Sequence, residues 1–95
     1  MYHRYEMRSD MKGTMNGMMH GLDGKTGDDF DRAFIKEMIM HHEGAVEMAE
    51  EALEHSNHAE IKTLSNAIIS AQTKEINEMN VWYKNWFGSE VPAGN

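Results

Sequence analysis

The sequence predicts an all-α protein, an antiparallel hairpin of two long helices that follows a methionine-rich N-terminal segment. A stretch from about residue 29 to 55, and the stretch that follows it to about residue 87, both carry apolar side chains three and four positions apart. That spacing marks one face of a helix. Only the polar link His55-Ser56-Asn57-His58 separates the two stretches, and a tight link makes long helices antiparallel neighbours.

The composition narrows the classes of partner. The 95-residue chain is one small domain with 9 basic and 16 acidic side chains and a net charge of -7. We expect no nucleic-acid partner, because nucleic acids and anionic membranes attract basic surfaces. No apolar run approaches the roughly 20 residues of a membrane-spanning helix, so no membrane insertion is expected. The absence of cysteine excludes disulfides, thiolate zinc sites and cysteine nucleophiles.

Residues 1–27 are predicted to be a flexible or short-helical arm that binds metal. They hold five glycines, and six of the chain's 10 methionines fall within the first 19 residues. The methionines recur at helical spacing, at Met7, Met11, Met15, Met18 and Met19. The stretch Met1 to Gly21 lacks the apolar core of a signal peptide. Either the protein is exported and its signal is absent from this sequence, or it is cytoplasmic.

The hairpin domain is expected to span residues 28–88. Acidic residues suit the start of the first helix, whose apolar face comprises Ile35, Met38, His42, Ala45, Val46, Ala49 and Leu53. Asn57 and Glu60 resemble a capping box for the second helix. The apolar stripe of that helix comprises Ile61, Leu64, Ile68, Ile69, Ile76, Met79, Trp82, Tyr83 and Trp86. Gly88 stops it, and residues 89–95 are expected to be a loose tail.

The two stripes are too wide for one hairpin to bury. We therefore expect a homodimer that forms a four-helix bundle, with the N-terminal segment as the alternative cover for part of the surface.

The candidate metal ligands in the hairpin are Met38, His41, His42 and Met48. Met38 lies one turn before His42, and His41 shares an edge of the helix with Met48. Thioether sulfur and imidazole nitrogen in one cluster suit copper, and the thioether favours Cu(I) in particular. The alternative is that the methionines only fill gaps in the core.

Polar residues of the second helix are expected beside this cluster. With the turn centred near residue 57, His42 lies level with Gln72, and Met38 lies level with Glu75. In one interpretation His42, Gln72 and Glu75 form a buried hydrogen-bonded layer that fixes the helix register. In the other, His42 and Met38 hold the metal while Gln72 or Glu75 orients the imidazole.

The remaining histidines have separate interpretations. His20 joins the methionines of the N-terminal arm as a candidate ligand. His3 can bind Cu(II) in a square-planar set of nitrogens if Met1 carries a free amino group. His55 and His58 flank the turn and are expected to be solvated, although a surface metal site is the alternative. The sequence does not decide the role of Met40.

Two motifs resemble a known family. The first is Asp31-x-x-Phe34-x-x-x-Met38-x-x-His41-His42-x-x-Ala45-x-x-Met48-Ala49, and the second is Ile68-Ile69-x-x-Gln72-x-x-Glu75-Ile76-x-x-Met79-x-x-Trp82. Together they are similar to the pattern of the CopM-like copper-binding family, a bacterial domain-of-unknown-function group numbered 305, over residues 28–87. The resemblance implies a ferritin-like helical fold, copper or silver binding, a periplasmic location and a role in metal tolerance. It adds Met79 to the ligands and leaves the N-terminal arm outside the match.

Three classes of function follow. The first is a protein without enzymatic activity that sequesters or buffers copper for tolerance or trafficking, with Ag(I) as a mimic and copper-exporting proteins as partners. The second is a ferritin-like di-iron oxidase, or ferroxidase, but no Glu or Asp is followed by His three positions later, as such sites require. The third is a structural dimerisation module without metal.

Overall fold

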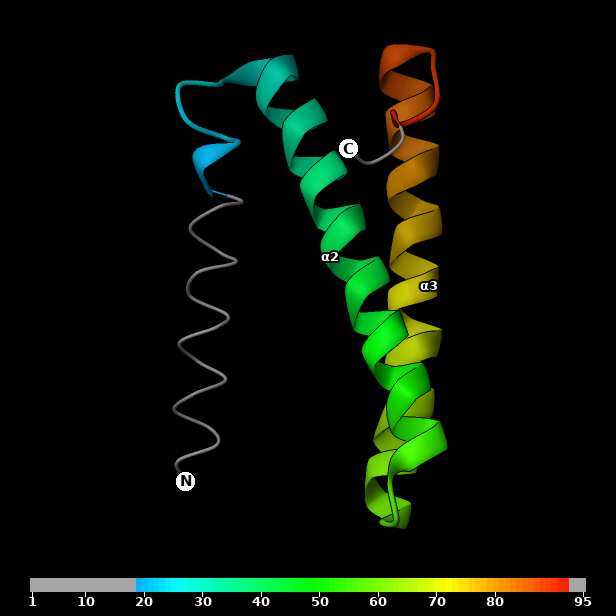
Figure 1. The fold of residues 1–95 in the computed structure, drawn as a ribbon. Coiled ribbons are helices and arrows are strands. Elements are labelled where there is room, and N and C mark those ends of the chain that lie inside the picture. Colours follow the sequence, from blue (N-terminus) through cyan, green and yellow to red (C-terminus); the bar gives the residue numbers. More distant parts are fainter. Residues whose placement is uncertain (1–18, 93–95) are drawn as a thin grey trace.

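The computed structural model describes residues 19–92 and confirms the predicted hairpin. Helix α2 spans Gly27–His55 and helix α3 spans Ala59–Phe87, each 29 residues long. The two helices run antiparallel and pack against each other, joined by a short link (Figure 1). Residues 1–18 and 93–95 lie outside the described part, and so does most of the predicted N-terminal arm.

The helix boundaries agree with the predicted ones to within two residues, but one cap differs. Asp28 and Asp29 occupy the first turn of α2, where carboxylates interact favourably with the helix dipole. The expected capping box at Asn57 and Glu60 does not form. Helix α3 starts one residue later, with His58 as its N-cap residue and without a side-chain cap. Instead, the backbone N–H of His58 donates to Ser56 Oγ at 3.1 Å.

The core is narrow, and the size of its buried side chains changes along the hairpin. Ile35, Ile39, Met79 and Tyr83 form its buried cluster toward the open end. Nearer the link, the buried residues are small: Ala49 and Ser65, whose hydroxyl donates to the Ile61 carbonyl at 2.7 Å. Small side chains allow helices to approach closely, and large ones hold them apart. This gradient agrees with Figure 1, where the helices draw apart toward the open end.

The C-terminal tail is packed more firmly than expected over the residues that the structure describes. Gly88 ends α3 in the left-handed conformation (φ 75°), and its N–H donates to the Lys84 carbonyl. The chain then folds back along the end of α3 (Figure 1). Val91 packs there against the core cluster. The diverging helices leave apolar surface at this end, and Val91 covers part of it.

Neither α2 nor α3, nor any other helix within residues 19–92, is long and apolar enough to cross a membrane.

Replacing Ile35 with alanine tests the importance of this narrow core. Ile35 is only 2% exposed, so we expect Ile35→Ala to lower the free energy of unfolding by about 2–5 kcal/mol. Val81 is 55% exposed, and Val81→Ala should change it by no more than about 0.5 kcal/mol. Urea unfolding followed by circular dichroism, at one protein concentration, measures both. Equal effects of the two substitutions would show that the core is not where the structure places it.

Candidate metal centre

Among residues 19–92, one side-chain hydrogen bond joins the two helices, between His42 of α2 and Glu75 of α3. The Nε2 atom of His42 lies 2.6 Å from Glu75 Oε1. The histidine side chain is 8% exposed, whereas that of Glu75 is 52% exposed. The pair therefore runs from the helix interface outward, with the imidazole inside and the carboxylate at the rim. Because the carboxylate is exposed, water can hydrogen-bond the oxygen atoms that His42 does not.

This contact assigns different roles to the two ring nitrogens of His42. A carboxylate can only accept a hydrogen bond, so Nε2–H donates to Glu75. In the neutral imidazole Nδ1 then carries a lone pair. Nδ1 is buried and has no hydrogen-bond partner within residues 19–92. A buried lone pair without a donor is costly, and it is also the group that ligates a metal ion.

The contact falls on Glu75 rather than on Gln72, which we expected to lie level with His42. In an antiparallel pair each side chain leans toward the N-terminus of its own helix. The His42 side chain therefore leans toward the level of Glu75, and that of Glu75 leans toward His42. Gln72 is half-buried, and its Oε1 is also buried without a partner in the described region. The expected three-residue polar layer is thus reduced to one hydrogen bond.

Two thioethers lie on the open-end side of this pair. Met38 is one turn before His42 on α2, and Met79 is one turn after Glu75 on α3. Met79 is 5% exposed, and half-buried Met38 packs against the cluster that contains it. Met38, His42 and Met79, here called the inner group, combine two soft sulfur donors with one imidazole. This donor set fits Cu(I) or Ag(I) and suits hard ions poorly.

The other two predicted hairpin ligands lie outside the interface. His41 is exposed, and Met48 is 69% exposed on the same edge of α2 two turns later. The rings of His41 and His42 are edge to face with centroids 6.1 Å apart. Burial therefore divides the cluster that the sequence predicted into the inner group and an outer pair, His41 and Met48. The sequence placed His41 on one edge of the helix with Met48 but did not predict this separation.

The N-terminal candidates are described only in part. Met19 is 57% exposed. His20 Nδ1 lies 3.5 Å from Asp23 Oδ2, and both side chains are largely exposed. Gly21, Leu22 and Lys25 take part in hydrogen-bonded turns that lead into α2. The remaining candidates of the arm lie outside the described residues: His3, Met7, Met11, Met15 and Met18.

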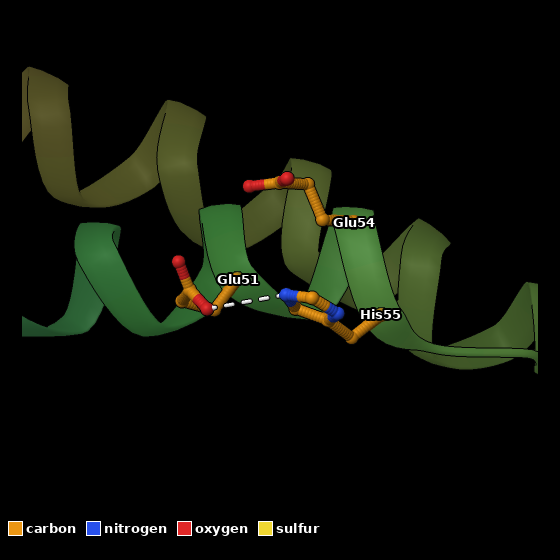
Figure 2. A group of neighbouring side chains, drawn as sticks. All are labelled: Glu51, Glu54 and His55. Carbon is orange, nitrogen blue, oxygen red and sulfur yellow. Dashed lines mark ion pairs between the residues drawn. The ribbon is translucent and has the colours of Figure 1, made fainter.

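A third group of possible ligands lies near the link, where solvated side chains were expected and a surface metal site at His55 was the alternative. Glu51, Glu54 and His55 offer ligand atoms within 4.8 Å of one another, and all three are exposed. Figure 2 shows them on one helix, with His55 Nε2 facing the Glu51 carboxylate at 3.4 Å. Their spacing of three and four residues was the available signal. A di-iron site instead uses inward carboxylates from facing helices, and no Asp or Glu in residues 19–92 is buried.

The family of this chain is shown by a match between its sequence and a protein-family model. The model of the family described as domain of unknown function DUF305 matches residues 1–83, and the chain belongs to this family. The resemblance seen in the sequence is thereby confirmed. The match extends farther than the motifs did, because it begins at residue 1 and so includes the N-terminal arm. The N-terminal methionines, which were candidate ligands on composition alone, therefore lie within the residues that match the family.

Solved structures of CopM resemble the hairpin in several metal states. Apo CopM is 46% identical over 68% of this chain and 48% of its own, with a TM-score of 0.65. The Cu(I)-bound form gives the same identity and score, covering 68% and 47%. The Cu(II)-bound form is 45% identical, with a TM-score of 0.63, covering 67% and 48%. This chain thus spans about half the length of the CopM chains it matches. A comparison with curated proteins found no match.

The contact between His42 and Glu75 predicts the tautomer of His42. In the metal-free protein, long-range ¹H–¹⁵N spectra of the histidine side chains should show His42 with its proton on Nε2. In Glu75→Ala the preference should weaken, because the acceptor that fixes the proton is lost. Exposed His41 serves as the internal control and should not change. A His42 proton on Nδ1 in the unsubstituted protein would contradict the assignment.

Proposed function

We propose that this protein binds Cu(I), with Ag(I) as a mimic, through Nδ1 of His42 and the thioethers of Met38 and Met79. The observation that carries the proposal is the buried Nδ1 atom of His42, which has no hydrogen-bond partner among residues 19–92 while Nε2 is hydrogen-bonded to Glu75. The CopM structures support the choice of ion, because they include Cu(I)-, Cu(II)- and silver-bound forms.

Each residue of the proposed site has a physical role. Glu75 orients the imidazole and fixes its tautomer, as carboxylates do beside histidine ligands of metals. Met38 and Met79 supply soft sulfur that carries no acidic proton, so protons compete only at the imidazole. Their packing in the core limits the motion of both side chains before metal arrives. The ligands then lose little conformational entropy on binding.

The outer pair and the N-terminal arm extend the proposal. His41 and Met48 offer further borderline and soft donors at the surface. The methionines of residues 7–19 and His20 offer more soft and borderline donors for the same ions. Cu(II) binding at His3 belongs to the same proposal if Met1 carries a free amino group.

The cellular role that fits these donors is storage and transfer of copper rather than catalysis. A site of thioethers and imidazole holds the ion, and several such groups on one chain increase its capacity. We propose that the protein sequesters or buffers copper for tolerance or trafficking in the periplasm. Copper-exporting proteins are the partners proposed for transfer.

Removing the thioethers of the inner group should weaken Cu(I) binding while preserving the fold. Met38→Leu and Met79→Leu nearly conserve volume, so the core should remain intact. The double variant should bind Cu(I) roughly tenfold or more weakly, since even supporting groups of metal ligands contribute on this scale. Competition against a calibrated Cu(I) chelator under reducing conditions measures the affinity. Met40→Leu is the matched control, because Met40 is 45% exposed on the opposite face.

Two results of this titration would count against the proposal. Unchanged Cu(I) affinity in the double variant would move the site away from the inner group. Tighter binding of Fe(II) than of Cu(I), with consumption of oxygen, would instead support the ferroxidase alternative.

A further inference from the structure

One side of the hairpin carries large apolar side chains that α2 and α3 do not bury against each other. Phe34, Met48, Leu64 and Trp82 are all exposed, and each comes directly before a buried residue. One residue is a rotation of about 100° around a helix. Because the helices are antiparallel, the same rotation on each carries these side chains to one side of the hairpin, here called the apolar face. Residues three, four or seven positions away add Phe30, Ala45, Ala52, Ala67, Ala71 and Trp86 to it.

The apolar face is confined to that side of the hairpin. On α2, Lys36 and Glu43 come directly after buried residues, so the opposite side of this helix is charged. Polar side chains interrupt the apolar face near mid-length, at His41, Glu75 and Glu78. A contiguous apolar surface on one side of a chain marks a contact with another molecule.

The side chains on the apolar face differ in size between its two ends. At the open end Phe34 stacks on Phe30 with ring centroids 5.9 Å apart, and Trp82 stacks on Trp86 at 6.0 Å. The helices also draw apart toward this end (Figure 1). The hairpin is therefore a wedge, bulky at the open end and thin at the link. The half nearer the link contributes four alanines to the face: Ala45, Ala52, Ala67 and Ala71.

Two wedges of this shape pack with an even thickness when they point in opposite directions. The bulky end of each then lies over the thin end of the other, and close packing is best where large side chains meet small ones. The middle residues of α2 and α3 are 41 and 73. Phe34 and Met48 lie equally far on either side of the first, as Leu64 and Trp82 do of the second. With full overlap, Phe34 faces Met48 of the second copy, and Leu64 faces its Trp82.

The charges of the hairpin favour the same orientation. Residues 42–73, the half nearer the link, hold six carboxylates and one lysine. The other half, residues 19–41 and 74–92, holds eight carboxylates and five lysine or arginine side chains. Copies that point in the same direction would bring the two cation-poor halves together, and like charges repel. Opposite directions instead place the half with most of the cations over the half with fewest.

We propose that a second copy of this chain covers the apolar face in the opposite orientation, open end over link, and so forms a four-helix bundle. A two-fold axis at mid-length gives both copies the same contacts, as in an isologous dimer. This chain spans about half the length of the CopM chains that it matches, so two copies of the matched part come to about the length of one such chain. The contact is made by apolar side chains and requires no metal.

The first test is the mass of the full chain by analytical ultracentrifugation, with a chelator present to remove metal. The protein should associate with increasing concentration to twice 10.9 kDa. Leu64→Glu should abolish the dimer, because it places a charge within the apolar face. Val81→Glu is the matched control and should remain dimeric. Val81 is 55% exposed and Leu64 is 56% exposed on the same helix, but Val81 lies on the side of α3 that faces away from α2.

The second test determines the orientation by cross-linking singly substituted proteins. The chain has no cysteine, so each substitution supplies one thiol. The reagent should join thiols about 8–10 Å apart, the usual distance between the axes of packed helices. A mixture of Phe34→Cys and Met48→Cys proteins should give roughly tenfold more cross-linked dimer than either protein alone, because these positions face each other only between copies. A mixture of Phe34→Cys and Trp82→Cys proteins should show no such gain.

The results that would overturn the proposal are distinct. Cross-linking in the mixture of Phe34→Cys and Trp82→Cys, but not in the other, would show that the copies point in the same direction. Cross-linking in neither mixture would place the contact off the apolar face. A chain that stays monomeric at every concentration would overturn the dimer itself. The inner group lies within each chain, so a monomer that binds Ag(I) leaves the proposed function intact, and a dimer that binds none contradicts that function alone.

Discussion

The hydrogen bond between His42 and Glu75 is the interaction on which the proposed site depends. It crosses the interface of the two helices at mid-length and uses one ring nitrogen, and the other nitrogen is buried without a hydrogen-bond partner among residues 19–92. Because both residues lie on rigid helices, the orientation of the ring is set by the fold rather than by a loop. Met38 and Met79 lie one turn away on the same side of this bond. Met79 thus belongs to both the core cluster and the proposed site, and Met38 packs against that cluster.

The small size of the core explains why apolar side chains remain exposed. The core of a single hairpin is narrow, and its buried cluster at the open end consists of Ile35, Ile39, Met79 and Tyr83. The tail closes part of that end through Val91, but Phe34, Trp82 and Trp86 stay exposed. A small helical protein with so little buried surface gains stability from a bound ion or a partner. Metal binding and association are therefore expected to contribute to folding as well as to function.

Most of the fold could be predicted from the helical periodicity of the sequence. It predicted both helices, their antiparallel pairing and the end of α3 at Gly88, because apolar spacing and a C-terminal glycine are local signals. It could not predict that the Nε2 atom of His42 meets Glu75 rather than Gln72, because that choice depends on how side chains lean across the interface. The cap at His58 and the packing of Val91 also depend on contacts that no local pattern records. For the site, residue type identified the candidate ligands, whereas only burial separated His42 from His41.

The central claim is that His42 ligates metal through Nδ1 while Glu75 retains the proton on Nε2. The most direct measurement is a titration of ¹⁵N-labelled protein with Ag(I), followed through the side-chain nitrogen resonances of all six histidines. The account predicts that, at the first equivalent, the Nδ1 resonance of His42 shifts while the proton on Nε2 persists. If His42 keeps its metal-free spectrum while other histidines respond, the buried imidazole is a structural residue and the metal binds elsewhere.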